Sequence, residues 1–525
     1  MHIGAFFDGG KPGVDRRDQR PCRFLDVLSK IGYFVELGVN AIQPLPIVEF
    51  PPEYSLGYNG TDYFSPEIAC FVPPTDPDFP NYLKTANDLL HAKGKSTHSA
   101  DDLATQPAQL KALVDICHVY GLAVLFDVVY NHAGAFDDQS LYFFDRQDPG
   151  NPYDNNHSLY FTNQGLAGGL VFAFWNQDVR QFLINNARFN YDVYHIDGYR
   201  YDEVTVIVNQ GGSSGYQFCQ NLTDTLHYHK PSAVQIAEYW NFDKNQIVRP
   251  TGTGGGGFDA VWYDGLRDVL RGTIVAASGG ANVSLDLGGL RDQLAPKLAD
   301  AWRSVQHLEN HDLLWINLGG GPKPRVARLA DPNNARSWYA RSRARVANGL
   351  LITAPGTPML FMGQEFLEDK PWTDAGQFHP GLGIYWDGLT SDRVMQDFLR
   401  SMQELIWLRR KHPALRGEGV HAYYNHNDNR VLAVQRWIEG IGRDVVIVAS
   451  LNESTFWSYR IGFPQVGQWL EVYNSDTYDN FPNPMVAGNC GSVWATPTPR
   501  DGLPASATIV IPANGLLVFA LDRGD

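Results

Sequence analysis

The stretch HIDGYRYDEV, residues 195–204, decides the fold and locates the functional residues. It begins as a short apolar run and then places Asp197, Arg200, Asp202 and Glu203 within seven positions. A buried strand does not carry such a charge density without a function, so we interpret the stretch as a strand that ends in a site. An arginine beside Asp202 favours the ionised carboxylate that a nucleophile needs. A structural ion pair at a strand end is the alternative, because such pairs also perturb pKa values.

Strand-like segments alternate with helical segments on both sides of this stretch. The apolar stripe within residues 24–35 predicts a helix that ends at Gly38, and a second stripe within 110–117 predicts one that ends at Gly121. Residues 48–103, rich in Pro, Tyr and Asp, are expected to form a long loop. The expected strands are residues 2–7, 40–47, 122–129, 194–199, 233–238, 258–262, 304–309 and 358–362. This alternation predicts the α/β class and a closed (β/α)8 TIM barrel.

Two segments fall outside the barrel pattern. The third βα connection, residues 131–175, is too long for a turn and predicts a small inserted domain after strand 3. Alternating strands at 430–438, 444–451 and 507–520 predict a C-terminal all-β sandwich domain. The expected domains are a catalytic barrel of residues 1–130 and 176–417, an inserted domain of 131–175, and a β-sandwich of 418–525.

Composition restricts the class of partner. The 525 residues carry a formal net charge of −15, which argues against nucleic acid or an anionic membrane as a partner. The aromatic content of 13% suits the stacking of sugar rings.

Five scattered cysteines without a Cys-x-x-Cys pattern favour a reducing compartment. The sequence shows no long apolar run and no basic leader, so we expect a cytoplasmic protein; its oligomeric state stays open.

Four of the expected strands end in chemically active side chains. These are Asp127–His132 after the third strand, Arg200 and Asp202 after the fourth, Glu238 after the fifth, and His311-Asp312 after the seventh. In a barrel these strand ends converge on one opening. Two carboxylates about 5 Å apart can serve as nucleophile and general acid in a retaining glycosidase, and a third can stabilise the positive charge on the ring.

Taken in order, these motifs resemble those of the α-amylase family of retaining α-glucan enzymes, and the resemblance covers essentially the whole chain. It implies that Asp202 is the nucleophile, Glu238 the acid/base and Asp312 the transition-state carboxylate. It also implies supporting or substrate-binding roles for six more residues: Arg200 orients Asp202, His132 and His311 bind sugar hydroxyls, Asp127 and Asn131 brace the site, and Tyr58 stacks on the ring.

Flanking segments narrow the resemblance. Residues 45–51, 176–198 and 362–366 are similar to glycogen branching enzymes and to maltooligosyltrehalose trehalohydrolases. Where α-amylases usually carry Lys-His after the nucleophile, this chain has Thr205-Val206, which speaks against plain endo-amylase activity and against calcium. No metal or cofactor is therefore expected. Branching enzymes usually carry Ser at the position of Asn310 and a β-sandwich before the barrel, whereas this chain starts at the first expected barrel strand.

The predicted function is cleavage of α-1,4-glucosidic bonds in starch- or glycogen-type polysaccharide by double displacement, followed by transfer that forms a branch. Malto-oligosaccharides are possible substrates as well. An α-amylase-type hydrolase is the first alternative. A catalytically weak glucan-binding protein is an alternative from another class, and the intact carboxylates argue against it.

Other residues of suggestive chemistry have competing interpretations. The spacing of His227 and His229 favours a surface helix over a metal site. Trp175, Trp240 and Trp262 could stack on glucose or pack in the core. The aromatic residues within 142–160 and 239–240 could form an apolar groove that admits an acceptor chain and excludes water.

Overall fold

The computed structural model describes residues 1–6, 20–51, 54–134, 158–167, 169–375 and 379–524. The chain forms two compact units. The first contains Met1–Trp262 and Thr373–Ile384, and the second contains Tyr263–Trp372 and Tyr385–Asp525.

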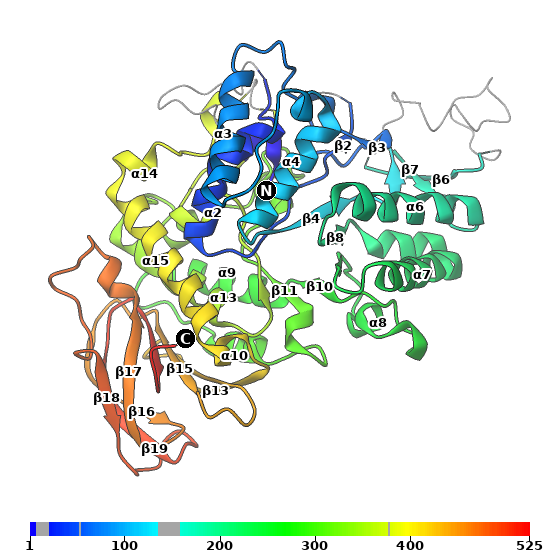
Figure 1. The fold of residues 1–525 in the computed structure, drawn as a ribbon. Coiled ribbons are helices and arrows are strands. Elements are labelled where there is room, and N and C mark those ends of the chain that lie inside the picture. Colours follow the sequence, from blue (N-terminus) through cyan, green and yellow to red (C-terminus); the bar gives the residue numbers. More distant parts are fainter. Residues whose placement is uncertain (7–19, 52–53, 135–157, 168, 376–378, 525) are drawn as a thin grey trace. The chain divides into compact units, whose positions relative to one another are not determined.

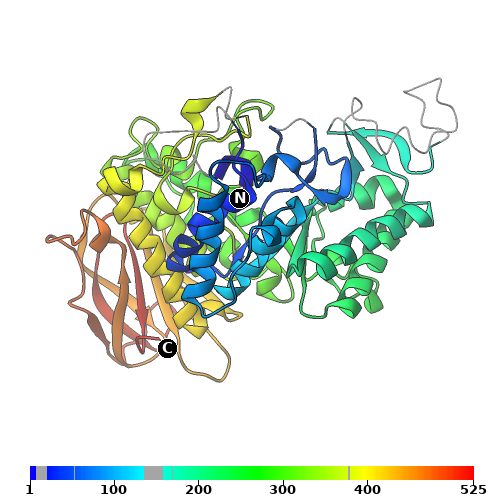
Figure 2. The same cartoon turned by 45° about the horizontal axis from the view of Figure 1, so that its top comes forward.

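The first unit is organised around parallel strands that alternate with helices (Figures 1 and 2). The strands, in spatial order, are β1 (Ala41–Ile42), β4 (Ala123–Val128), β8 (Gly198–Tyr201), β9 (Val234–Ala237) and β10 (Ala260–Tyr263). The main helical elements are η1 (Phe24–Lys30), α2 (Ile31–Leu37), α3 (Phe79–Ala92), α4 (Gln106–Val119), α6 (Gln177–Tyr194) and α7 (Val204–His229). Each neighbouring pair of these strands is parallel, which confirms the α/β prediction.

Three sequence predictions in this unit were wrong. Residues 3–6 of the expected first strand form a helical turn, α1 (Ile3–Phe6), because a short apolar run without alternation does not distinguish strand from helix. The expected loop 48–103 contains the helix α3, whose buried Phe79, Ala86 and Leu90 form a stripe within a polar composition. The expected strand 194–199 begins only at Gly198, because α6 continues through Tyr194 and ends at a left-handed His195.

Several strands are shorter than expected. The segment 40–47 pairs only at Ala41–Ile42, where Pro44 and Pro46 follow and provide no N–H donor. The observed strand β11 (Ser304–Gln306) covers half of the segment 304–309, and β12 (Thr357–Pro358) starts one residue before the segment 358–362.

A small antiparallel sheet lies within the segment expected to form an inserted domain. It has the order β5-β7-β6, from β5 (His132–Ala133), β6 (Phe161–Leu166) and β7 (Gly169–Phe172). The aromatic residues Tyr142, Phe143, Phe144 and Tyr153 lie outside the described residues. Tyr160 is half-buried against the edge of the Phe182 ring. The domain boundaries at 131 and 175 stay a prediction.

The second unit contains the parallel pair β11 and β12, several helices and an antiparallel C-terminal part. Its main helices are α9 (Gly265–Ser278), α10 (Leu287–Leu294), α11 (His311–Leu314), α12 (Val326–Ala330), α13 (Trp338–Thr353) and α15 (Arg393–Lys411). In the long helix α15, the buried Met395, Phe398, Met402 and Leu405 mark the inner face.

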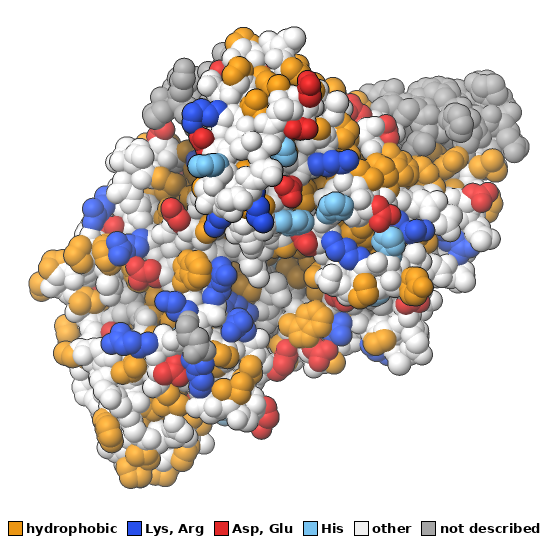
Figure 3. Space-filling model, in the orientation of Figure 1, with side chains coloured by type: hydrophobic (Ala, Val, Ile, Leu, Met, Phe, Trp, Pro, Cys, Tyr) orange, Lys and Arg blue, Asp and Glu red, His pale blue; other side chains and the backbone are white. Residues whose placement is uncertain are grey.

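None of the helices in the described ranges is long and apolar enough to cross a membrane. On the face shown in Figure 3, acidic and basic side chains are interspersed.

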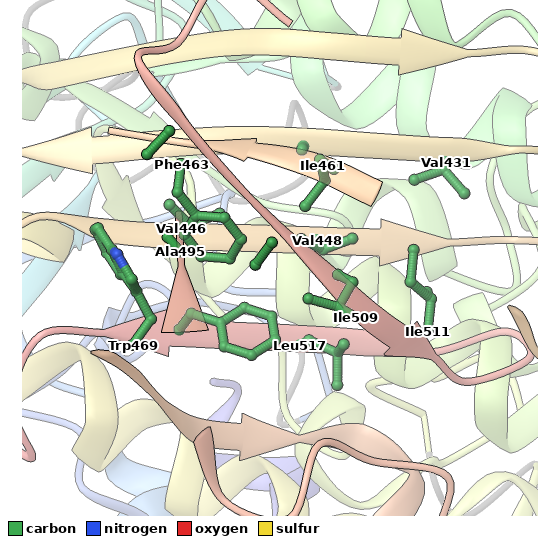
Figure 4. Close-up of a cluster of buried hydrophobic side chains, with 14 residues drawn as sticks. Val431, Val446, Val448, Ile461, Phe463, Trp469, Ala495, Ile509, Ile511 and Leu517 are labelled. Carbon is green, nitrogen blue, oxygen red and sulfur yellow. The ribbon is translucent and has the colours of Figure 1, made fainter. Parts of the chain in front are cut away.

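The C-terminal part is an all-β fold, as predicted. Its larger sheet is antiparallel and has six strands, in the spatial order β13 (Gly419–His426), β14 (Val431–Trp437), β15 (Val445–Ser450), β20 (Leu516–Ala520), β17 (Gly467–Asn474) and β18 (Ser492–Ala495). Its smaller sheet pairs β16 (Phe456–Phe463) with β19 (Ala505–Ile511). Ile461 and Ile509 of the smaller sheet belong to one buried cluster with Val446, Val448 and Leu517 of the larger (Figure 4). The two sheets therefore share one apolar core.

Arg436 of β14 ties this all-β part to the end of α13. Its buried guanidinium donates hydrogen bonds to the carbonyl oxygens of Thr353, Leu415, Gly417 and Gly419. The C-terminal carbonyls of a helix have no partners within the helix, so an arginine is well suited to bind them.

We expect Arg436→Met to destabilise the protein by about 2–4 kcal/mol, because buried carbonyl oxygens lose their donors. The melting temperature should fall by roughly 5 °C or more, measured by circular dichroism. Arg460→Met is the matched control, since Arg460 is exposed on β16. Equal melting temperatures of the two variants would contradict this role for Arg436.

Candidate active site

The carboxyl ends of β4, β8 and β9 bring the predicted site residues of the first unit together. The parallel register pairs Asp127 with Arg200, and Arg200 with Ile236 two residues before Glu238. The chain then stays in register beyond the strands, because the Asp202 N–H donates to Val128 O and the Glu238 N–H donates to Tyr201 O. The side chains of Asp127, Arg200, Asp202 and Glu238 therefore come from one edge of the sheet.

Arg200 is the centre of this group. Its side chain is fully buried and contacts three carboxylates: Asp127 at 2.7 Å, Asp202 at 2.9 Å and Glu238 at 2.7 Å. Burial opposes the charge, but the carboxylates of Asp127 and Glu238 outweigh it and hold the pKa of Arg200 well above its ordinary value. The guanidinium is therefore a permanent cation that favours the ionised form of its neighbours.

Asp202 is held from two directions. Arg200 Nη1 lies 2.9 Å from its Oδ1, and Asn131 Nδ2 donates to both its Oδ2 and its main-chain oxygen at 2.8 Å. Only 11% of the Asp202 side chain is exposed. These contacts fix the orientation of the carboxylate beside a cation, which suits a nucleophile.

His132 and Tyr58 lie at the edge of the same group. His132 contacts Asn131 through Nδ1, and burial lowers its pKa although Asp202 raises it, so the imidazole is neutral near pH 7. The Tyr58 hydroxyl donates to Asp127 Oδ2 at 3.0 Å, and Arg200 Nη1 donates to that hydroxyl at 3.3 Å. Asp127 is thus occupied by Arg200 and Tyr58, which fits a bracing role.

Glu238 differs from Asp202 in its donors. Its Oε2 accepts the main-chain N–H of Glu203 at 2.8 Å and lies 2.7 Å from Arg200 Nη2. Glu203 has left-handed backbone angles of φ 38° and ψ 49° directly before α7. The sequence pattern gave no sign of this contact, because it depends on the backbone conformation of Glu203 and not on its side chain.

Trp262 is a second residue whose role was not identified from the sequence. Its ring is buried, and Arg200 Cζ lies 4.5 Å from the ring centre. A cation over an indole face is a favourable electrostatic contact. Trp262 therefore packs beneath the arginine, which resolves the earlier choice between sugar stacking and the core in favour of the core.

The second unit holds His311 and Asp312 on the first turn of α11. Asn310 begins this helix, and its side-chain oxygen accepts the Leu313 N–H at 2.8 Å. His311 Nε2 lies 3.1 Å from Asp312 Oδ1, and the Asp312 side chain is 53% exposed. Trp372 Nε1 donates to the main-chain oxygen of His311 and fixes the start of the turn. The Asp312 carboxylate is thus accessible from solvent.

The buried histidine His307 lies directly after β11 and four residues before His311. Burial, with Arg267 adding to it, lowers the pKa of His307 to about 3, so this ring stays neutral. Asn310 Nδ2 lies 3.4 Å from His307 Nε2. His307 therefore supports the residue that begins α11 and adds no charge beside Asp312.

Thr205 stands where α-amylases usually carry lysine, and its hydroxyl makes a contact within the first unit. The Trp240 N–H donates to the Thr205 hydroxyl at 2.8 Å, so the first turn of α7 is bound to the segment that follows Glu238. Lysine at this position would not offer that acceptor.

The remaining aromatic and histidine candidates lie in different environments. Trp175 is 62% exposed, Trp240 is half-buried beneath Lys244, and Tyr239 is buried, so Tyr239 does not line a groove.

His227 contacts Asp259, and His229 contacts Asp192, so the two rings point to different partners. Within the described ranges, no group of three or more His, Cys, Asp or Glu residues has the arrangement of a metal site.

Comparison with known proteins identifies similar chains. Residues 423–522 match the family model described as "Alpha amylase, C-terminal all-beta domain". The 1,4-alpha-glucan branching enzyme GlgB of Mycolicibacterium paratuberculosis is 27% identical over 98% of this chain and 64% of its own length. The enzyme of the same name from Myxococcus xanthus is 27% identical over 99% of this chain and 65% of its own length. The chain thus spans slightly less than two thirds of the length of these relatives.

Solved structures establish the fold. An α-amylase from Geobacillus thermoleovorans, complexed with acarbose, aligns with a TM-score of 0.66 at 18% identity, over 99% of this chain and 97% of that one. A pullulanase from Bacillus acidopullulyticus aligns with a TM-score of 0.67 at 17% identity, over 99% of this chain and 60% of that one. These likenesses confirm the predicted fold class, a barrel of the α-amylase type followed by an all-β domain.

Proposed function

We propose that this chain, which belongs to the α-amylase family, cleaves α-1,4-glucosidic bonds in starch- or glycogen-type polysaccharide and transfers the released segment to the 6-hydroxyl of an acceptor chain. The observation that carries the proposal is that one guanidinium, that of Arg200, contacts both Asp202 and Glu238. Two carboxylates that contact one guanidinium are neighbours, as the nucleophile and the acid/base of a retaining glycosidase must be.

The chemical roles follow from the two environments. Asp202, fixed by Arg200 and Asn131, attacks the anomeric carbon while Glu238 protonates the leaving oxygen. The bond from the anomeric carbon to the leaving oxygen breaks, and a covalent glucosyl–Asp202 intermediate forms. Glu238 then removes the proton from the acceptor hydroxyl, whose oxygen displaces Asp202.

Three further residues have proposed roles. Asp312 stabilises the positive charge that develops on the sugar ring in the transition state, and His311 and the neutral His132 bind sugar hydroxyls. The half-exposed Asp312 carboxylate and the neutral His132 imidazole both suit these tasks. A neutral ring can donate through one nitrogen and accept through the other, as a hydroxyl requires.

The choice of transfer over hydrolysis rests on the relatives, which are named 1,4-alpha-glucan branching enzymes. The substitution of Thr205-Val206 for Lys-His also favours it. Among the described residues, the five cysteines form no disulfide and four of them are buried, which supports a proposed cytoplasmic location.

We expect amylose incubated with the protein to gain α-1,6 linkages with little rise in reducing ends, because an acceptor hydroxyl replaces water. New anomeric proton signals after exhaustive trimming would report the linkages, and a reducing-end assay would report hydrolysis. Asp202→Asn serves as the control for spontaneous or contaminating activity. A steep rise in reducing ends without an α-1,6 signal would assign the protein to the hydrolases instead, and binding of amylose without any product would favour a glucan-binding protein.

A further inference from the structure

The residue after the proposed nucleophile has an unusual backbone conformation. Glu203 has φ 38° and ψ 49°, in the left-handed region that a residue with a Cβ atom rarely occupies. Such a conformation persists only where the surrounding structure enforces it, and it is concentrated at functional sites.

The surrounding contacts show what enforces it. On one side, the Asp202 N–H is bound to Val128 O of β4. On the other, the Val206 N–H closes the first turn of α7 on Glu203 O, and the Thr205 hydroxyl accepts the Trp240 N–H. The turn at Glu203 therefore joins a strand end to a helix whose position is fixed on both sides.

This turn directs the Glu203 N–H to Glu238 Oε2 at 2.8 Å. Arg200 Nη2 lies 2.7 Å from the same oxygen. A proton on Oε2 would point toward the Glu203 N–H or the Arg200 cation, whereas an unprotonated Oε2 accepts the N–H and lies favourably against the cation. Oε2 thus remains an acceptor in both protonation states of Glu238.

We propose that Glu203 is a positioning residue whose left-handed main chain reserves Oε2 of Glu238 as an acceptor and so confines the catalytic proton to Oε1. The proposal rests on the assignment of Glu238 as the acid/base. The proton passes from Oε1 to the leaving oxygen as the glucosidic bond breaks, and the acceptor hydroxyl returns a proton to Oε1. The side chain of Glu203 is not needed for this role; its N–H and its backbone angles are.

The charges around Glu238 determine the sign of the expected pH effect. They belong to Arg200 of β8, to Asp202 and Glu203 in the following turn, and, through Arg200, to Asp127 of β4. An N–H donor to Oε2 favours the ionised carboxylate, so its loss raises the pKa of Glu238. Activity that needs protonated Glu238 should then persist to higher pH.

The test compares Glu203→Asn, Glu203→Ala and Glu203→Val. All three remove the same carboxylate, but asparagine tolerates left-handed angles, alanine tolerates them less well, and valine disfavours them strongly. With amylose as substrate, we expect Glu203→Asn to keep kcat within about threefold of the unmodified protein, with the same pH profile. Glu203→Val should lower kcat by about tenfold or more, with little change in KM, and should move the basic limb of the pH profile to higher pH. Glu203→Ala should lie between them and serves if the valine variant does not fold.

A merely structural role for Glu203 predicts a different pattern. Activity of the valine variant would fall while the basic limb of its pH profile stays at the same pH, or the asparagine and valine variants would have the same kcat and the same pH profile. Either result in an active protein would overturn the inference. Infrared titration of the Glu238 carboxyl, identified by subtraction of Glu238→Gln, measures the same pKa shift without turnover. If the unmodified protein forms no product but the pKa of Glu238 is higher in Glu203→Val than in the unmodified protein, the proposed function fails while the positioning role of Glu203 stands. If the infrared titration shows no such difference in pKa, the inference fails.

Discussion

Asp202→Asn and Glu238→Gln should each lower turnover on amylose by about 10³-fold or more while the protein keeps its fold. Asp202→Asn replaces the nucleophilic carboxylate with a neutral, weakly nucleophilic amide, and Glu238→Gln removes the acidic proton that the leaving oxygen takes up. Both substitutions keep nearly the same side-chain volume, so the buried surroundings of Arg200 should stay packed.

Asp192→Asn is the matched control, because Asp192 is a carboxylate on α6 that contacts His229 away from this group. Initial rates with purified proteins, together with melting curves, separate loss of chemistry from loss of fold. Turnover of either active-site variant within tenfold of the unmodified protein would refute the assignment.

The second large effect is expected at Asp312. Asp312→Asn should lower kcat by about 10²-fold or more while glucan binding changes by less than about threefold, because the charge on the ring develops only in the transition state. The carboxylate is half exposed and contacts His311, so its charge is accessible to substrate.

Binding can be measured without turnover by calorimetry with maltoheptaose, comparing Asp202→Asn with the double variant that also carries Asp312→Asn. Asp292→Asn provides a surface control, since that carboxylate pairs with Arg291 on α10. An unchanged kcat with a raised KM would show instead that Asp312 only binds the ground state.

Sequence reasoning identified the residues whose chemistry shows in their side chains. Asp127 and Arg200 lie near the ends of β4 and β8, and Asp202 and Glu238 directly follow β8 and β9. The structure brings the three carboxylates together around the Arg200 guanidinium. The parallel register explains why they lie together, because the carboxyl ends of neighbouring parallel strands meet at one edge of the sheet. Their roles stay a proposal. His311 and Asp312, which also follow a strand, stand together at the start of α11.

What sequence reasoning missed depends on backbone conformation and packing. The left-handed angles of Glu203 come from the fixed positions of β8 and α7, and no side-chain type encodes them. The position of Trp262 beneath Arg200 depends on β10 lying next to β9. The helix α3 was missed because its apolar stripe is sparse within a polar segment.

The C-terminal part shows the same limit. Its all-β class follows from alternating residues, but the strands β13, β16, β17 and β18 were not predicted individually. Their exposed faces carry large apolar side chains such as Trp457 and Trp494, which weaken the alternation of buried and exposed positions.

The central claim is that Asp202 forms a covalent bond to glucose, and trapping that bond tests it most directly. A 5-fluoro-α-glucosyl fluoride reacts with a retaining enzyme but leaves slowly from the intermediate, because fluorine destabilises the positive charge of both transition states. Mass spectrometry of the digested protein should then find one fluoroglucosyl group on the peptide that contains Asp202, and none in Asp202→Asn. A label on another residue, or turnover of amylose without any label, would contradict the account.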